Sequence, residues 1–246
     1  MHYVMADLHG EHDRWRRMLD RIAFSDADTL YILGDVVDRG GIGGVDILLD
    51  VMERPNVVML LGNHEAMCLK AMDHPDNGRA VSHWRRNGGQ VTCGALLRLS
   101  EEKRTRVLDF IRARPDHLDL ELDGRRFHLV HGFPADNTYD RVWLRPGPEA
   151  ESPFPDGRIV VAGHTPVCEL WDYDDDALER YLRELPGGHL CIFHGKGYID
   201  VDCACGYGIS QRRLACGWRI WRSSMNKKSF CFSIKQYFNS IYKESE

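Results

Sequence analysis

Five apolar segments of this chain each end at a short polar motif, and this repeated pattern restricts the available folds more than any other feature. In chain order the motifs are Asp7-Leu8-His9-Gly10, Gly34-Asp35-Val36-Val37-Asp38-Arg39-Gly40, Gly62-Asn63-His64-Glu65, His131-Gly132 and Gly163-His164-Thr165-Pro166. Each preceding apolar segment has the length and composition of a buried strand. Ligands gather beyond the carboxyl ends of strands in layered α/β folds, so we expect the five motifs to meet at one edge of a sheet.

Strand and helix patterns alternate in the first third of the chain, which predicts βαβ units and a largely parallel central sheet. The predicted strands are residues 2–6, 29–33, 56–61, 117–122, 125–130, 159–162, 190–193, 196–201 and 212–220. The predicted helices are residues 11–23, 45–52, 65–72, 90–99, 100–112 and 174–185. Asp123-Gly124 predicts a tight hairpin turn, and we place a second turn at His194-Gly195. Residues 133–157 are rich in Pro, Gly and acidic residues and are predicted to form a long surface loop.

Length and composition indicate a globular protein with one large domain, or one domain with an appendage. The 246 residues are 43% hydrophobic and 28% charged, which is ordinary for a folded soluble chain. No apolar run approaches the roughly 18 residues of a membrane span, and the N-terminus does not resemble a signal peptide. We therefore expect a cytoplasmic protein with reduced cysteines and no membrane partner. The net charge of −5 argues against a nucleic-acid partner.

The polar residues of the five motifs suit a pair of divalent metal ions. Asp35 is the best candidate for a carboxylate that bridges both ions. The remaining predicted ligands are Asp7 and His9 for one ion, and Asn63, His131 and His164 for the other. Mixed oxygen and nitrogen ligands favour Mn²⁺, Fe²⁺ or Zn²⁺ over Mg²⁺ alone. Two such ions about 3.5–4 Å apart can clamp the attacking and leaving oxygens of a phosphoryl transfer, and a bridging water would supply the nucleophile.

Three further motif residues suit the remaining steps of such a reaction. His64 follows a predicted metal ligand and is placed to protonate a departing alkoxide. Asp38 is expected to hydrogen-bond the His64 imidazole and to favour its charged form. Arg39 is expected to hold the phosphate by a bidentate contact, which lysine would make less well.

Together, the first three motifs resemble the signature of the phosphoprotein phosphatase family within the calcineurin-like metallophosphoesterases. The motifs at His131 and His164 are similar to those of its bacterial and phage branch. His83-Trp84-x-x-Asn87-Gly88-Gly89 resembles a segment of the lambda-phage protein phosphatase. The resemblance covers roughly residues 1–217, and it departs from the usual pattern where Ala6 replaces a common glycine.

The resemblance implies an α/β fold, the calcineurin-like metallophosphoesterase fold, with a central β-sandwich flanked by helices. It implies two metal ions, most often Mn²⁺ in bacterial members, and hydrolysis of phosphomonoesters with His64, Asp38 and Arg39 in the roles given above. It also implies a second phosphate-binding arginine after a tryptophan. In Val142-Trp143-Leu144-Arg145 this residue is Arg145.

We therefore predict a metal-dependent phosphatase that acts on phosphoserine and phosphothreonine, with phosphorylated proteins or peptides as its partners. Two alternatives stay open. A diadenosine tetraphosphate hydrolase would share the fold, although members of that group usually have aspartate where Glu65 stands. A non-catalytic metal-binding regulatory protein is the second alternative, and the complete ligand set argues against it. The sequence does not predict the oligomeric state.

The end of the chain differs from the rest. Residues 218–246 carry a net charge of +4, whereas the preceding residues carry −9, and their aromatic residues follow no clear period. We therefore divide the chain into a metallophosphoesterase domain at 1–217 and an atypical tail at 218–246. Two explanations for the tail stay open: a genuine appended segment, or a segment read in a shifted frame.

Overall fold

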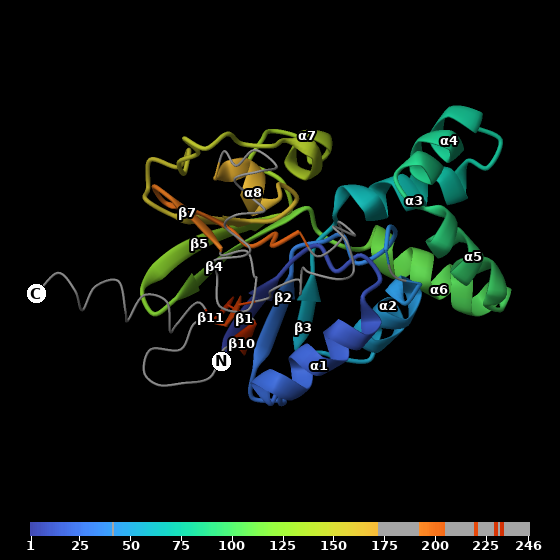
Figure 1. Cartoon of the computed structure of the whole chain (residues 1–246), viewed down its shortest axis with the longest axis horizontal. Coiled ribbons are helices and arrows are strands. Elements are labelled where there is room, and N and C mark those ends of the chain that lie inside the picture. The colour runs from blue at the N-terminus through green and yellow to red at the C-terminus, as the bar shows by residue number, and fades with distance from the viewer. Residues whose placement is uncertain (41, 172–191, 205–218, 221–228, 231, 234–246) are drawn as a thin grey trace, which may run out of the picture.

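Two β-sheets stack face to face, and helices cover their outer faces (Figure 1). The computed structural model describes residues 1–40, 42–171 and 192–204, together with the backbone of three short strands between residues 219 and 233. The predicted helix at 174–185 lies outside the described residues, as do most of the predicted strand at 212–220 and most of the tail at 218–246.

The first sheet contains the N-terminal strands and has the order β11-β1-β2-β3. Its members are β1 (His2–Met5), β2 (Thr29–Ile32), β3 (Val57–Met59) and β11 (Phe232–Ser233). Strands β1 to β3 are parallel, and β11 is antiparallel to β1. Helices α1 (His12–Ile22) and α2 (Gly44–Met52) connect the parallel strands, which confirms the predicted βαβ units.

The second sheet is mixed and has the order β4-β5-β6-β8-β7. Its members are β4 (His117–Leu122), β5 (Arg125–Val130), β6 (Ile159–Ala162), β7 (Phe193–Gly195) and β8 (Tyr198–Asp200). The three inner strands are parallel, but the edge strands β4 and β7 are antiparallel to their neighbours. The prediction of a largely parallel sheet is therefore confirmed for the first sheet, but in the second sheet it holds only for the three inner strands.

The two hairpins of the second sheet test the turn predictions. The turn at Asp123-Gly124 is confirmed, because Leu122 pairs with Arg125 across it. The turn at His194-Gly195 was wrong by two residues: both belong to β7, and the chain turns at Lys196-Gly197. Gly197 has a φ of +66°, a left-handed conformation that glycine adopts without strain.

An apolar layer fills the space between the two sheets and confirms the central β-sandwich. The first sheet contributes Val4, Ala6, Tyr31, Leu33 and Leu60, and the second contributes Phe127, Leu129, Val161, Ile199 and Val201. On the far side of the first sheet, Trp15 of α1 and Leu48 of α2 pack into a larger core. On the far side of the second sheet, Val130 and Val160 pack with Val167 and Leu170 of α8. The strands that lead into the carboxyl edge are therefore packed on both faces.

The remaining helices surround this carboxyl edge. They are α3 (Asn63–Asp73), α4 (Gly78–Arg86), α5 (Gln90–Arg98), α6 (Glu101–Arg112), α7 (Thr138–Trp143) and α8 (Val167–Leu170). Helix α7 lies inside the predicted long loop at 133–157, and the sequence did not predict α4 either. The short strands β9 (Arg219–Ile220) and β10 (Ser229–Phe230) pair with each other. None of the helices in the described ranges is long and apolar enough to cross a membrane.

Candidate metal centre

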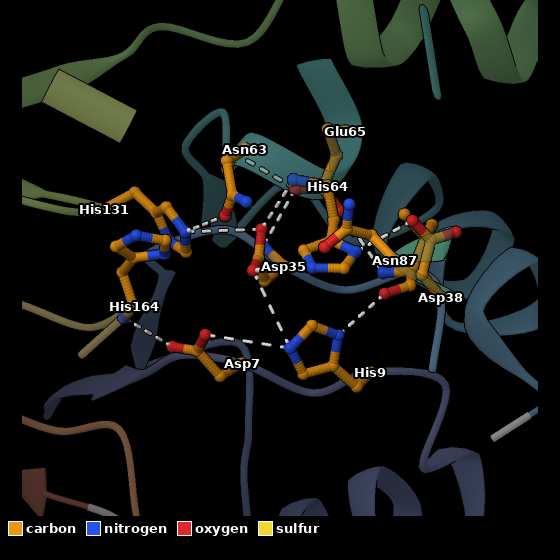
Figure 2. Close-up of polar contacts among 12 residues, drawn as sticks. Asp7, His9, Asp35, Asp38, Asn63, His64, Glu65, Asn87, His131 and His164 are labelled. Atoms are coloured by element: carbon orange, nitrogen blue, oxygen red, sulfur yellow. Dashed lines mark hydrogen bonds and ion pairs between the residues drawn. The ribbon is translucent and has the colours of Figure 1, made fainter. Parts of the chain in front are cut away.

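The five motifs meet at one place, across the carboxyl ends of strands from both sheets. Figure 2 shows Asp35 with the other five predicted ligands around it, and all six are buried. Asp7, His9, Asp35 and Asn63 follow strands of the first sheet, whereas His131 and His164 follow β5 and β6 of the second. The predicted gathering of these residues is confirmed, while their role as metal ligands stays a prediction.

One group of ligand atoms surrounds the Nε2 atom of His9. His9 Nδ1 donates a hydrogen bond to the Val37 carbonyl at 2.9 Å, so Nε2 of the neutral ring carries a lone pair. This Nε2 lies 3.7 Å from Asp35 Oδ2 and 3.8 Å from Asp7 Oδ1, and it is buried without a hydrogen-bond partner among the described residues. A buried lone pair that faces two carboxylate oxygens fits a cation between them.

A second group of ligand atoms surrounds the Asn63 side chain. His131 Nδ1 donates to the Leu33 carbonyl at 2.8 Å, which turns Nε2 toward Asp35 Oδ1 at 3.3 Å, and Nε2 can bind a metal once it has lost its proton. The Asn63 side-chain oxygen lies 3.0 Å from His131 Nε2 and 3.1 Å from His164 Nδ1, among atoms that all accept hydrogen bonds. These acceptor atoms repel one another unless a cation lies between them. Rotation of the Asn63 amide by 180° would also satisfy them, because its NH₂ group would then donate to the surrounding atoms. The residues therefore fit a second divalent ion, which would share Asp35 with the first.

Burial and charge in the centre also favour cations. Burial, followed by the nearby Asp202 carboxylate, raises the pKa of Asp7 well above its usual value. Burial lowers the pKa of His9 well below its usual value, which keeps the ring neutral and able to bind a metal. Burial would raise the pKa of Asp35 too, but His131 and His64 hold it well below its usual range. A bound divalent cation would offset the cost of burying these carboxylates.

The backbone of the centre is held in left-handed conformations that non-glycine residues seldom adopt. The site residues with positive φ are Asp7 (56°), His9 (43°), Asp35 (54°), Asp38 (71°), Arg39 (63°) and His164 (66°). Each such residue costs on the order of 1 kcal/mol, and clusters of them are typical of functional sites. The sheets behind these turns supply the packing that maintains the strain.

His64 lies beside the first ligand group and is oriented by Asp38, as predicted. Its Nδ1 donates to Asp38 Oδ2 at 2.8 Å, and the Trp84 indole N–H donates to the same oxygen at 2.8 Å. Its Nε2 lies 3.9 Å from Asp35 Oδ2 and has no hydrogen-bond partner among the residues described. The ring is therefore fixed, and Nε2 remains available for proton transfer at the centre.

The two predicted phosphate-binding arginines differ in position. The Arg39 backbone N–H donates to the Gly88 carbonyl at 3.3 Å, and its charge is close enough to oppose protonation of His9. Arg145 lies at the rim, where its guanidinium forms an ion pair with Glu169 at 2.8 Å. Burial lowers the pKa of His164 to about 3, and the charges of His131 and Arg145 add to this effect. A phosphate role for Arg145 stays a prediction, and it requires this ion pair to open.

Glu65 is a positioning residue that the sequence reasoning missed. Its carboxylate accepts N–H groups from Asp35 at 2.8 Å, Val36 at 2.8 Å, Val37 at 3.2 Å and Gly62 at 3.1 Å. Glu65 therefore ties the turn that carries Asp35 to the start of α3. The approach is so close that a Cβ atom at Gly62 would overlap Asp35. The available signal was the position of Glu65 three residues after the N-cap Gly62, where glutamate often binds backbone N–H groups.

A second missed group lies in and after β8. The Tyr198 hydroxyl donates to Asp200 at 2.7 Å, and Asp200 accepts the backbone N–H of Asp202 at 2.8 Å. Burial raises the pKa of Asp202 to about 6, and its carboxylate is a main cause of the raised pKa of Asp7. Burial raises the pKa of Asp200 well above its usual value, which favours its neutral form, whereas Asp202 is largely ionised at neutral pH and adds negative charge behind the centre.

Mn²⁺ binding is expected to release protons and to weaken as the pH falls below about 9. Burial alone would lower the pKa of His131, but the Asp35 and Asp7 carboxylates raise it to about 9. The imidazole must lose its proton to bind a metal, so each pH unit below that value should weaken the apparent affinity about tenfold. Titration calorimetry in two buffers of different ionisation enthalpy measures both effects. A pH-independent affinity without proton release would contradict the assignment of His131.

Comparison with known proteins identifies the class to which this geometry belongs. The sequence profile described as "Calcineurin-like phosphoesterase" matches residues 3–195. The chain belongs to this family of metallophosphoesterases, and the predicted fold class is confirmed. The chain also resembles a protein serine/threonine phosphatase structure from Saccharomyces cerevisiae, with a TM-score of 0.52 and 16% identity over 94% of this chain and 78% of that one. At this identity the likeness concerns the fold alone.

Curated relatives carry two different names. The chain is 28% identical over 139 residues to serine/threonine-protein phosphatase 2 of Salmonella typhimurium. This alignment covers 56% of this chain and 61% of the relative. It is 32% identical over 209 residues to the symmetrical bis(5'-nucleosyl)-tetraphosphatase of Delftia acidovorans. This alignment covers 81% of this chain and 69% of the relative. The chain thus spans about 60 to 70% of the length of these relatives. They support a hydrolase and leave its substrate open.

Proposed function

We propose that this chain is a metal-dependent phosphoprotein phosphatase that hydrolyses phosphoserine and phosphothreonine in proteins. The observation that carries the proposal is the position of the Asp35 carboxylate, whose Oδ2 atom lies 3.7 Å from His9 Nε2 and 3.9 Å from His64 Nε2 and whose Oδ1 atom lies 3.3 Å from His131 Nε2. One carboxylate shared by two cations, beside an oriented imidazole, is suited to metal-assisted hydrolysis of a phosphoester.

The protein groups have separate tasks in this reaction. Two bound divalent ions, most readily Mn²⁺ and alternatively iron or zinc, would stabilise charge on the phosphoryl oxygens and supply a water nucleophile at neutral pH. Asp38, which also accepts the Trp84 indole N–H, fixes the His64 ring through Nδ1, and Nε2 would face the leaving oxygen. Arg39 holds the phosphate, with its backbone fixed by Gly88. His64 gives its proton to the departing serine or threonine alkoxide.

A symmetrical dinucleoside tetraphosphatase is the second candidate. It is favoured by the greater extent of similarity to the Delftia tetraphosphatase, which covers 81% of this chain. The ligand groups and His64 would serve either reaction, because both cleave a P–O bond at a metal-bound phosphoryl group. Glu65 favours the phosphatase, since the tetraphosphatases usually have aspartate at this position.

Hydrolysis of three substrates separates the candidates. Wild-type protein loaded with Mn²⁺ is expected to hydrolyse p-nitrophenyl phosphate and a phosphothreonine peptide, and to cleave diadenosine tetraphosphate more slowly. Asp35→Asn is the matched inactive control, because it keeps the side-chain shape and removes the shared charge. A kcat/KM for diadenosine tetraphosphate at least tenfold above that for the peptide would replace the proposal with the second candidate. A metal-loaded protein inactive on all three would contradict both.

A further inference from the structure

Helix α7 packs closely on the two histidines of the second ligand group. The backbone N–H of Gly132, the residue after His131, donates to the Arg141 carbonyl of α7 at 2.8 Å. A Cβ atom at Gly132 would lie only 2.8 Å from that carbonyl oxygen, so a side chain there would push the helix away. At the end of α7, the Trp143 carbonyl lies 3.3 Å from His164 Nε2. One helix therefore contacts the segments of both histidines.

The contact with Trp143 determines which nitrogen of His164 can bind a metal ion. When Nε2 donates its proton to the Trp143 carbonyl, the lone pair of the neutral ring is on Nδ1, which lies 3.1 Å from the Asn63 side-chain oxygen. Histidines that bind metals usually donate their other N–H to a carbonyl or carboxylate, and loss of such a partner typically weakens metal affinity about 10–100-fold. The position of α7 is therefore important for the second ion.

Asp116 anchors the start of α7, although it lies outside the five motifs. Its Oδ2 atom accepts the Thr138 hydroxyl and an Arg141 N–H at 3.0 Å, and its Oδ1 atom accepts His117 Nδ1 at 2.6 Å. Burial alone would raise the pKa of Asp116, but the hydrogen bonds from Thr138, His117 and Arg141 lower it to about 2. The carboxylate therefore stays charged at neutral pH and joins α7 to the start of β4.

The segment that carries Asp116 also contacts the first sheet. The Pro115 carbonyl accepts the backbone N–H of Leu61, two residues before Asn63, at 2.8 Å. Helix α7 in turn lies against α3, which begins at Asn63. Asp116 and α7 therefore belong to one network of contacts that reaches the three ligands predicted for the second ion alone.

We propose that Asp116 is a positioning residue for the second metal ion, because through α7 it holds His131 and His164 in the orientation that binds the ion. The inference rests on the metal centre of the proposed function and not on the choice of substrate. Asp7 and His9 are the ligands predicted for the first ion alone, and none of the hydrogen bonds of Asp116 and α7 named above involves them. Loss of Asp116 should therefore weaken one metal site of the two.

The test is calorimetric titration of the metal-free protein with Mn²⁺. Wild-type protein is expected to bind two ions per chain. Asp116→Ala should weaken one binding step about tenfold or more and change the other by less than about twofold. Thr138→Val with Arg141→Leu keeps the carboxylate and removes its partners on α7, so this variant should weaken the same step.

A ligand variant identifies the weakened step. His164→Ala removes a predicted ligand of the second ion and should weaken that step. Asp116→Ala with His164→Ala should be little worse than His164→Ala alone, because both changes act on one site. Hydrolysis of p-nitrophenyl phosphate by Asp116→Ala should be slow at low Mn²⁺ and approach the wild-type rate at high Mn²⁺, since all six predicted ligands remain.

The matched control is Asp119→Ala. Asp119 on β4 also accepts a histidine, His128 at 2.7 Å, and an arginine, Arg158 at 2.8 Å, but neither partner lies on α7. This variant should leave both binding steps unchanged. Two unchanged steps in Asp116→Ala, equal weakening of both, or additive losses in the double variant would overturn the inference. Wild-type protein that binds fewer than two ions would instead contradict the metal centre itself.

Discussion

Replacement of His64 by asparagine is expected to lower kcat for an alkyl phosphate such as a phosphoserine peptide by about 10²–10⁴, the usual contribution of a general acid. The imidazole is fixed by Asp38 and Trp84, and its Nε2 has no other partner in the described structure. Asparagine cannot deliver a proton from that position. The loss should be smaller for p-nitrophenyl phosphate, because its leaving group departs as a stable phenolate.

Comparison of the kcat losses for the two leaving groups distinguishes the loss of a proton donor from a general disruption of the site. Metal content should stay at two ions per chain, because His64 is not among the predicted ligands. Asp38→Asn should lower kcat by a smaller factor, and the double variant should be little worse than His64→Asn alone, since both changes remove one function. Equal losses on both substrates, or loss of one ion in His64→Asn, would instead identify His64 as a metal ligand.

Replacement of Glu65 by alanine is expected to destabilise the fold by about 3 kcal/mol or more and to weaken Mn²⁺ binding. The change leaves four buried N–H groups without their acceptor, and each unsatisfied buried group costs about 1–3 kcal/mol unless water enters. It also releases the turn that positions Asp35. Urea unfolding with and without Mn²⁺, together with calorimetric titration of the metal, measures both effects.

Two matched variants sharpen the Glu65 result. Glu53→Ala removes an exposed glutamate just after α2 and should change stability by less than about 0.5 kcal/mol. Glu65→Gln keeps the size of the side chain but turns an NH₂ group toward the backbone donors, so it should be almost as harmful as alanine. If Glu65→Gln matched the wild type in stability and metal affinity, the carboxylate would not be the feature that holds the turn.

The candidate centre could be predicted well because each ligand follows an apolar strand. Strand ends are local features of a sequence, and parallel strands bring them to one edge without further information. Asp7, Asp35 and His131 were predicted in this way, and the structure brings them together. The left-handed backbone at Asp7 and Asp35 could not be predicted, since it depends on packing by both sheets rather than on residue type.

The helices α4 and α7 show where local patterns were insufficient. Only Trp84 of α4 is buried, so the helix has no repeated apolar side, and the Asn77 cap was its main local signal. Helix α7 has six residues within a region rich in turn-forming residues, and its Asn137 cap accepts the N–H of Asp140. Both helices are held by contacts with the centre, which are distant in sequence.

The contacts of Glu65 with residues distant in sequence and the ion pair of Arg145 were not predictable for the same reason. Glu65 accepts N–H groups from residues about 30 positions away, and no periodicity reveals such a contact. The sequence placed Arg145 near the phosphate by resemblance, and the structure adds its ion pair with Glu169 on α8. Pairings between distant side chains emerge only once the sheets are assembled.

The position of the centre across the seam of the sandwich limits when the chain can become active. Its contacts join Asp7 to the His164 N–H over 157 positions and His131 to the Leu33 carbonyl over 98. Neither sheet holds a complete set of ligands, so an intermediate with only the N-terminal βαβ half folded would be inert. Activity therefore requires both sheets to be assembled, and a bound metal pair would stabilise the contact between them.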